Sequence, residues 1–315
     1  MKSPENKLQR VLLAGATGTI GSAVAHALVA RGFNLTCVVR QGADTTHLPA
    51  DARIIEVDLT QTATHGDDDF DIVISCLASR SGVKADAWAV DYRANLNLLT
   101  IANETGAGQF ILLSAICVQR PKLEFQKAKL AFEEVLTKSG LSYQIVRPTA
   151  FFKSLSGQVK KVIGGKSFLV FGDGKITSCK PISDRDLANF IVDQIGNAKT
   201  FGKVLPIGGP GPAITPLDQA AHLFALIGQK PRIKHVSLKL MDAIIAILSL
   251  GAKIIPALEE KAEYARIGRY YATESMLAYD HEAGVYDADA TPSYGSDTLF
   301  DHYADLVDIT KAQAS

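Results

Sequence analysis

The sequence predicts an α/β fold with a doubly wound parallel sheet and a smaller C-terminal substrate lobe. Short apolar runs alternate with amphipathic stretches through the first half of the chain, as expected when helices cover both faces of a parallel sheet. The first run, Arg10 to Ala14, ends at the glycine-rich turn GATGTIG of residues 15–21. A strand that leads into such a turn is typical of the Rossmann type.

The predicted elements follow one another closely as far as residue 147. Ile20, Val24 and Leu28 share one face of a helix over residues 19–31, and Gly32 stands where a helix commonly ends. The other strands expected in this half are 34–40, 53–58, 71–76, 109–114 and 142–147, and the other helices are 86–104 and 123–139.

After Pro148 the pattern loosens, and glycine-rich turns separate the remaining segments. Helices are expected over residues 184–196 and 215–228. We therefore divide the chain into a nucleotide-binding domain over residues 1–150 and a substrate-binding lobe over residues 151–315. Segments of that lobe are also candidates for extra strands of the main sheet.

Composition excludes several classes of protein. The 33 basic residues equal the 33 acidic ones, which argues against a broad basic surface for nucleic acid. The four cysteines contain no C-x-x-C pair and the histidines no ligand spacing, so neither a metal site nor a disulfide framework is predicted. The short polar segment before Arg10 resembles no signal peptide, which favours a cytoplasmic bacterial protein.

One apolar stretch, Met241 to Leu258, needs a separate interpretation. Asp242 and Lys253 interrupt it, and the unbroken part is shorter than the roughly 20 residues that cross a bilayer. We expect a buried helix here. The alternative is an interfacial or lid helix against an apolar ligand, which would also allow peripheral contact with a membrane.

The turn of residues 15–21 has the form G-x-x-G-x-x-G and stands between a strand and a helix. Gly15 permits the tight turn, Gly18 lets the backbone approach a diphosphate, and Gly21 allows close packing of helix on strand. The cofactor contacts predicted in this turn are Gly15, Thr17, Gly18, Thr19, Ile20 and Gly21.

The end of the second strand indicates which nucleotide binds. NAD sites usually carry an acidic residue there, whereas this chain carries Arg40, whose guanidinium suits the 2′-phosphate of NADPH; the alternative is a solvated surface arginine. Asp58 is a candidate partner for the adenine amino group or, equally, a capping residue. The further contacts predicted at neighbouring strand ends are Leu59, Cys76, Leu77 and Ala78.

These residues, with Ser114 and the segment FQKAK of residues 125–129, resemble an atypical short-chain dehydrogenase/reductase of the NmrA and isoflavone-reductase-like type. The family pattern is Y-x-x-x-K, but Phe125 replaces the tyrosine and has no proton to donate, while Lys129 matches the lysine. The resemblance implies that Lys129 is catalytic and orients the nicotinamide ribose, and that Ser114 and Pro148 lie close to cofactor and substrate. Without the resemblance, the interpretation of Lys129 is an exposed helix lysine, and that of Ser114 is a strand-end serine that hydrogen-bonds to its own backbone.

Residues 124–132, 146–152, 270–277 and 286–299 are similar to the divinyl (proto)chlorophyllide 8-vinyl reductases of chlorophyll and bacteriochlorophyll synthesis. The resemblance implies NADPH-dependent reduction of the C8 vinyl group of a tetrapyrrole that carries its own magnesium. Negative charge left by hydride addition to a conjugated vinyl group spreads into the macrocycle, so the missing tyrosine is less damaging than in ketone reduction.

The aromatic pair at residues 151–152 and the overall activity each allow more than one interpretation. Phe151 and Phe152 are candidates for stacking on a flat substrate, or they are plain core. The alternative functions are an isoflavone-reductase-like reductase of a small substrate and a non-catalytic NADP sensor. The oligomeric state is not predicted.

Overall fold

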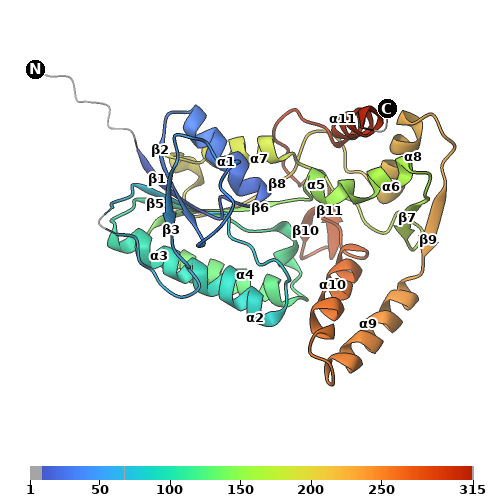
Figure 1. Ribbon diagram of the computed structural model, residues 1–315, viewed down its shortest axis with the longest axis horizontal. Coiled ribbons are helices and arrows are strands. Elements are labelled where there is room, and N and C mark those ends of the chain that lie inside the picture. Colours follow the sequence, from blue (N-terminus) through green and yellow to red (C-terminus); the bar gives the residue numbers. More distant parts are fainter. Residues whose placement is uncertain (1–8, 67, 314–315) are drawn as a thin grey trace, which may run out of the picture.

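The computed structural model describes residues 9–66 and 68–313, and within them seven parallel strands form one sheet (Figure 1). Their order in space is β3-β2-β1-β4-β5-β6-β8. The strands are β1 (Arg10–Ala14), β2 (Asn34–Val39), β3 (Arg53–Glu56), β4 (Ile72–Ser75), β5 (Gln109–Leu113), β6 (Ser142–Pro148) and β8 (Lys203–Ile207). This order reverses between β1 and β4, as in nucleotide-binding doubly wound sheets, and confirms the predicted Rossmann-type fold.

Helices cover both faces of the sheet (Figure 1). Alternate residues of a strand point to opposite faces, so Leu13 packs with Val24 and Ile191 on one side, while Leu12 packs with Phe132 on the other. The helices of the first face are α1 (Thr19–Ala30) and α7 (Asp184–Val192), and those of the second are α2 (Lys84–Ala87), α3 (Asn95–Glu104) and α4 (Glu124–Thr137).

The helix expected over residues 86–104 is present, but its middle is not α-helical. A π-helical segment, Trp88–Ala94, separates α2 from α3. Such segments are rare and frequently lie at functional sites, because the wider turn changes the direction in which side chains project. Here the π-helical segment carries Asp91, a carboxylate whose side chain is completely buried.

The chain beyond residue 150 contributes both to the sheet domain and to a second lobe. Strand β8 pairs with β6 and α7 packs on α1, so this part of the chain completes the sheet domain. The rest forms a second lobe around a core that includes Phe168, Phe224 and Tyr303. Its elements are α5 (Phe152–Leu155), α6 (Val159–Ile163), β7 (Phe168–Phe171), α8 (Pro216–Leu226), β9 (Ile233–Val236), α9 (Leu238–Ala252), α10 (Leu258–Tyr271), β10 (Ala278–Asp280), β11 (Val285–Asp287) and α11 (Leu299–Ala312).

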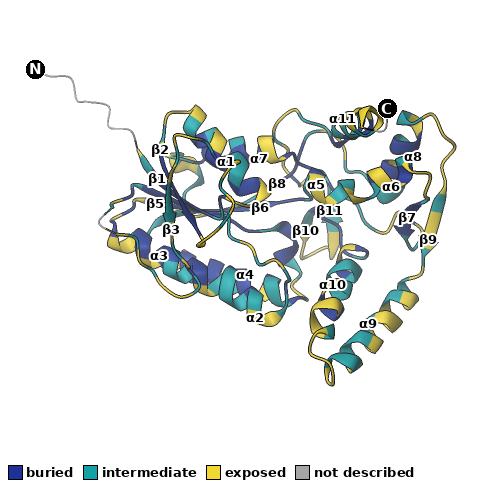
Figure 2. Ribbon diagram, viewed as in Figure 1, coloured by how far each residue is buried: buried dark blue, intermediate teal, exposed yellow. Residues whose placement is uncertain are grey.

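The expectation of a buried helix over residues 241–258 is wrong. Helix α9 packs chiefly against α10, and the two form a hairpin at the edge of the second lobe with exposed residues along α9 (Figure 2). Its outer face carries Leu240, Ile247 and Leu250, which are 55%, 71% and 65% exposed. An apolar run shows that a helix is hydrophobic but not how many neighbours cover it. Within residues 9–66 and 68–313, no helix has the length and apolar character needed to cross a membrane.

Candidate functional site

Two cavities lie at the carboxyl ends of the parallel strands. One, of about 260 Å³, opens at the switch point between β1 and β4. The other, of about 450 Å³, lies beyond the ends of β5 and β6 and is lined on its far side by residues of the second lobe. Ligands of open α/β sheets bind at this edge because strand order reverses there and leaves a crevice.

The smaller cavity gathers residues that are far apart in the sequence. The predicted cofactor residues that line it are Gly15, Thr17, Gly18, Arg40, Asp58, Leu59, Cys76, Leu77 and Ala78. The segment after β4 adds Arg80, Asp86 and Val90, which the sequence analysis did not select. Nothing in their local sequence pattern marks them as cavity residues: Arg80 and Asp86 precede the π-helical segment, and Val90 belongs to it.

Glycines make the turn after β1 unusually tight. Gly15 has φ +81°, and a Cβ atom there would lie 2.5 Å from the Cys76 carbonyl oxygen. A Cβ atom on Gly21 would lie 2.1 Å from the Gly15 carbonyl oxygen, so only glycine lets α1 start this close to the turn. Gly18 caps α1, whose N-terminal N–H groups therefore face the cavity edge, where an anion is stabilised.

The two other residues predicted in this turn have different surroundings. Ile20 is 6% exposed and packs into the core beneath α1. The Thr19 hydroxyl accepts a hydrogen bond from Lys153 Nζ at 2.8 Å, which links α1 to the second lobe. Neither side chain lines the two cavities described above.

Arg40 and Asp58 stand at adjacent strand ends on the rim of the smaller cavity, and both are exposed. Asp58 Oδ1 accepts hydrogen bonds from the Thr60 N–H at 2.9 Å and the Thr60 hydroxyl at 2.7 Å. This carboxylate therefore holds the turn after β3 in shape. Arg40 follows β2 directly, where a guanidinium can reach a ribose phosphate in the cavity.

Lys129 is a buried member of an ion pair. Its Nζ lies 2.9 Å from Asp91 Oδ1 and donates to the Leu77 carbonyl oxygen at 3.3 Å. The side chains of Lys129 and Asp91 are 10% and 0% exposed. Leu77 lines the smaller cavity, so the ammonium group contacts the predicted cofactor site through the Leu77 carbonyl oxygen.

Ser114 belongs to a second buried polar cluster. Its hydroxyl donates to Glu133 Oε1 at 2.5 Å, and Arg147 Nε donates to the same oxygen at 3.2 Å. The Arg147 guanidinium also pairs with Glu133 Oε2. Ser114 therefore lines neither cavity but fixes the ends of β5 and β6 relative to α4. The sequence did not predict a role for Glu133. It is a charged residue one helical turn after Lys129 and next to Phe132, on the apolar face of the helix, and such a position could have indicated a buried ion pair.

The larger cavity has mostly apolar walls. Pro148 and Phe151 line it, as do aliphatic side chains that include Val170 and Met276. Phe152 does not: it is 6% exposed and packs in the lobe core, with its ring centroid 5.5 Å from that of His302. Of the predicted aromatic pair, only Phe151 is placed to touch a ligand there.

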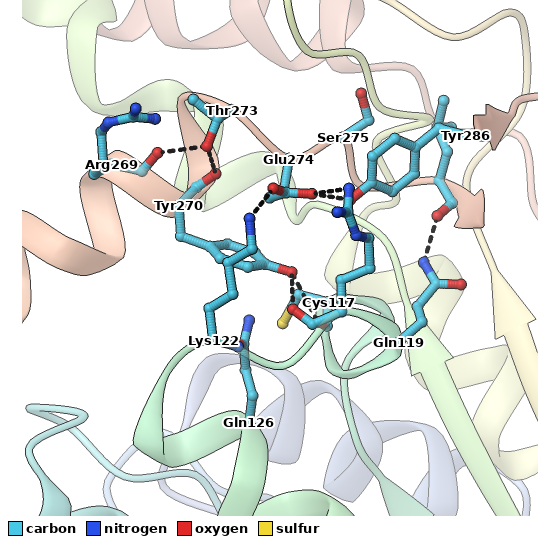
Figure 3. A network of polar contacts seen from close by, with 12 residues as sticks. Cys117, Gln119, Lys122, Gln126, Arg269, Tyr270, Thr273, Glu274, Ser275 and Tyr286 are labelled. Carbon is cyan, nitrogen blue, oxygen red and sulfur yellow. Dashed lines mark hydrogen bonds and ion pairs between the residues drawn. The ribbon is translucent and has the colours of Figure 1, made fainter. Parts of the chain in front are cut away.

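Glu274 lines the same cavity and anchors the second lobe. Its carboxylate accepts hydrogen bonds from Arg120 at 2.8 Å, Lys122 at 2.5 Å and the Tyr286 hydroxyl at 2.6 Å (Figure 3). Burial alone would raise the pKa of Glu274, but the bonds from Lys122 and Tyr286 outweigh it and hold that pKa below its usual value. Glu274 is therefore a carboxylate that connects the lobe to the segment after β5.

Other features of the site concern metals and the C-terminal segment. In the part of the chain that the structure describes, no cluster of three or more His, Cys, Asp or Glu side chains is arranged to hold a metal ion. Asp289, in the C-terminal segment that resembles the 8-vinyl reductases, lies outside both cavities, and its N–H donates to Asp287 Oδ1 at 2.8 Å in a turn after β11.

Comparison with known proteins agrees with this arrangement. The NAD(P)H-binding family matches residues 15–198. The chain is 47% identical to the chloroplastic divinyl chlorophyllide a 8-vinyl-reductase of Cucumis sativus, over 96% of this chain and 76% of that protein. Identity to the Arabidopsis thaliana protein of the same name is 45%, over 97% and 78%.

A solved UDP-glucose 4-epimerase from Thermotoga maritima, with UDP-glucose, superposes with a TM-score of 0.68. It is 16% identical over 98% of this chain and 100% of that one, so the likeness concerns the fold alone. The identity to the chloroplast reductases is far higher and extends over nearly the whole chain, which confirms the resemblance found in the sequence. The chain therefore belongs to the divinyl chlorophyllide a 8-vinyl-reductase family of NAD(P)H-binding oxidoreductases.

Proposed function

We propose that this protein reduces the C8 vinyl group of divinyl chlorophyllide or protochlorophyllide to an ethyl group and uses NADPH as reductant. The observation that carries the proposal is the position of the large apolar cavity, which lies at the ends of β5 and β6 beside the nucleotide cavity. Its apolar walls suit a flat macrocycle. The substrate brings its own magnesium, and the proposal requires none from the protein.

The residues of the smaller cavity fit a dinucleotide. Close backbone approach at Gly15 and Gly21 leaves room for a diphosphate at the start of α1. Arg40 offers a charged donor to a 2′-phosphate, which supports NADPH over NADH. When bound, the cofactor supplies a hydride to the vinyl group.

The side chains that line the larger cavity and those buried near the two cavities have separate tasks in this proposal. Pro148 and Phe151 hold one face of the macrocycle and exclude water from the reacting carbons. Lys129 fixes the Leu77 carbonyl and, through Asp91, the segment that covers the nucleotide. Glu133 and Arg147 keep the strand ends in register beneath both ligands.

The experiment that tests the function is anaerobic incubation of the purified protein with divinyl chlorophyllide and either NADPH or NADH. We expect conversion to the 8-ethyl product, seen as a shift of the Soret band and confirmed by chromatography, with NADPH clearly preferred. NADPH binding without conversion would instead favour a reductase of a small substrate or an NADP sensor. Equal rates with NADH would remove the assigned role of Arg40.

We also propose that the α9–α10 hairpin contacts the surface of an anionic membrane. Ile244, Ile247 and Leu250 form an exposed apolar stripe on α9, and the exposed Lys239 and Lys253 stand at its two ends. Cationic residues that flank an apolar stripe complement anionic headgroups around a shallow apolar insertion. No residue of α9 lines the two cavities described, so the stripe is free to serve this contact.

The double variant Ile247→Glu/Leu250→Glu is expected to bind phosphatidylglycerol-containing vesicles at least about tenfold more weakly than the wild type, because each side chain loses about 1.5–3 kcal/mol of apolar burial. Co-sedimentation with vesicles measures this loss. Ile309→Glu is the matched control, since Ile309 is a 52% exposed isoleucine on α11. Equal binding by all three proteins would contradict membrane contact through α9.

A further inference from the structure

The reduction requires a proton as well as a hydride, and the tyrosine of the Y-x-x-x-K pattern of short-chain dehydrogenases is absent. Phe125 stands at that position and packs against the apolar cluster that includes Leu123 and Ile267. A phenyl ring carries no acidic hydrogen. The proton must therefore come from another group at the substrate cavity or from water.

Helix α10 presents one residue of suitable chemistry to the larger cavity. Gly268, Tyr271 and Ala272 line it from a single helical face, since residues three and four apart are neighbours on a helix. The two flanking residues are small, so the phenol of Tyr271 is the group that projects from this face. It belongs to the second lobe, whereas the nucleotide cavity belongs to the sheet domain.

The hydroxyl of Tyr271 is held at the end of β5. It donates to Cys117 Sγ at 3.9 Å, while the neighbouring Tyr270 hydroxyl donates to the Cys117 carbonyl oxygen at 2.9 Å. A thiol is a weak acceptor, so the Tyr271 hydroxyl loses only a weak hydrogen bond when it donates to a ligand instead. Tyr271 is 42% exposed and Cys117 is 3% exposed, so a ligand reaches the phenol before the thiol.

Three of the other polar groups that line the cavity are less suited to donate. Glu274 is held as a carboxylate by three donors and carries no proton. The Thr149 hydroxyl is committed to the Lys180 carbonyl oxygen, and Gln158 is bonded to the backbone of Leu169 through both ends of its amide. Although 42% of the Tyr271 surface is exposed, desolvation of its hydroxyl beside the buried Cys117 raises the pKa of Tyr271 well above the usual tyrosine value, so the phenol stays protonated at neutral pH.

We propose that Tyr271 donates the proton that completes reduction of the vinyl group, because Phe125 stands where the Y-x-x-x-K pattern has its tyrosine. This inference rests on the proposed function. Hydride from the cofactor forms a C–H bond at the terminal vinyl carbon, and the π electrons of the C=C bond move onto the inner carbon and the macrocycle. The Tyr271 O–H bond then breaks, its proton bonds to the inner carbon, and the phenolate regains a proton from solvent. NADPH is oxidised to NADP⁺ and the vinyl group is reduced to ethyl.

The test is Tyr271→Phe, which keeps the ring and removes only the hydroxyl. We expect kcat to fall about 100-fold, the range of a lost general acid. The dissociation constants of divinyl chlorophyllide and NADPH, measured by absorbance and fluorescence titration, should stay within about twofold of the wild type, because a proton donor acts mainly in the transition state. The solvent deuterium isotope effect on kcat should also change, which a merely structural role would not require.

One variant serves as the control. Tyr264→Phe removes the same hydroxyl from a 50% exposed position on the same helix and should keep wild-type kcat. Wild-type kcat in Tyr271→Phe, or an equal loss of kcat in Tyr264→Phe, would overturn the inference. A wild-type protein that does not convert divinyl chlorophyllide would instead overturn the proposed function.

Discussion

Replacement of Lys129 by alanine is expected to lower the free energy of unfolding by about 3–5 kcal/mol and to remove most of the reductase activity. The physical reason is Asp91, whose side chain is completely buried and whose Oδ1 pairs with Lys129 Nζ at 2.9 Å. Asp91 Oδ2 has no hydrogen-bond partner among the described residues, so Lys129 is the charge that compensates this carboxylate. Thermal unfolding should show a fall in Tm on the order of 10 °C.

A double variant separates the two roles of Lys129. Asp91→Asn together with Lys129→Met removes both charges while nearly keeping the volumes, so most of the lost stability should return. If Lys129 also acts toward the cofactor, kcat stays low although Tm recovers. Recovery of both would make Lys129 a structural residue only.

Lys127→Ala is the matched control for this series. Lys127 lies on the same helix, but its side chain is 51% exposed and pairs with Glu124 on the surface. Its loss should change stability by less than about 0.5 kcal/mol, because exposed ion pairs contribute little. Full activity in Lys129→Ala would exclude a catalytic role, and an unchanged Tm would contradict the buried pair.

The nucleotide cavity could be predicted from the sequence because its signals are local. Gly15 and Gly21 mark a turn that only glycine allows, and Arg40 follows an apolar run that ends at the same edge of the sheet. Parallel strands bring their carboxyl ends together, so residues that end successive strands become neighbours without any further information.

The polar groups beneath the site could not be predicted in the same way. Asp91 faces Lys129 because of a π-helical segment, and the sequence pattern there reads as an ordinary helix. Tyr271 reaches Cys117 across more than 150 positions of the chain, a contact decided by packing of the second lobe. The prediction that helix α9 is buried failed for a related reason. Periodicity indicates whether a helix face is apolar, but it does not indicate whether another element covers that face.

Arg40→Ala is expected to raise the KM for NADPH about 10- to 100-fold and to leave the KM for NADH nearly unchanged. Arg40 is an exposed residue on the rim of the nucleotide cavity, at the end of β2. A hydrogen bond to a charged group contributes about 1.5–3 kcal/mol, and each 1.4 kcal/mol changes affinity tenfold. Initial rates with both cofactors at saturating pigment measure the change.

Salt dependence provides an independent check on Arg40. The preference of the wild type for NADPH should weaken as ionic strength rises, because an exposed guanidinium–phosphate pair is screened, whereas the variant should show little dependence. Arg53→Ala is the control, since Arg53 is an exposed arginine at the start of β3 that pairs with Asp68 and lines neither cavity. An unchanged NADPH preference in Arg40→Ala would place the 2′-phosphate elsewhere, and Arg80, which lines the same cavity, would be the next residue to replace.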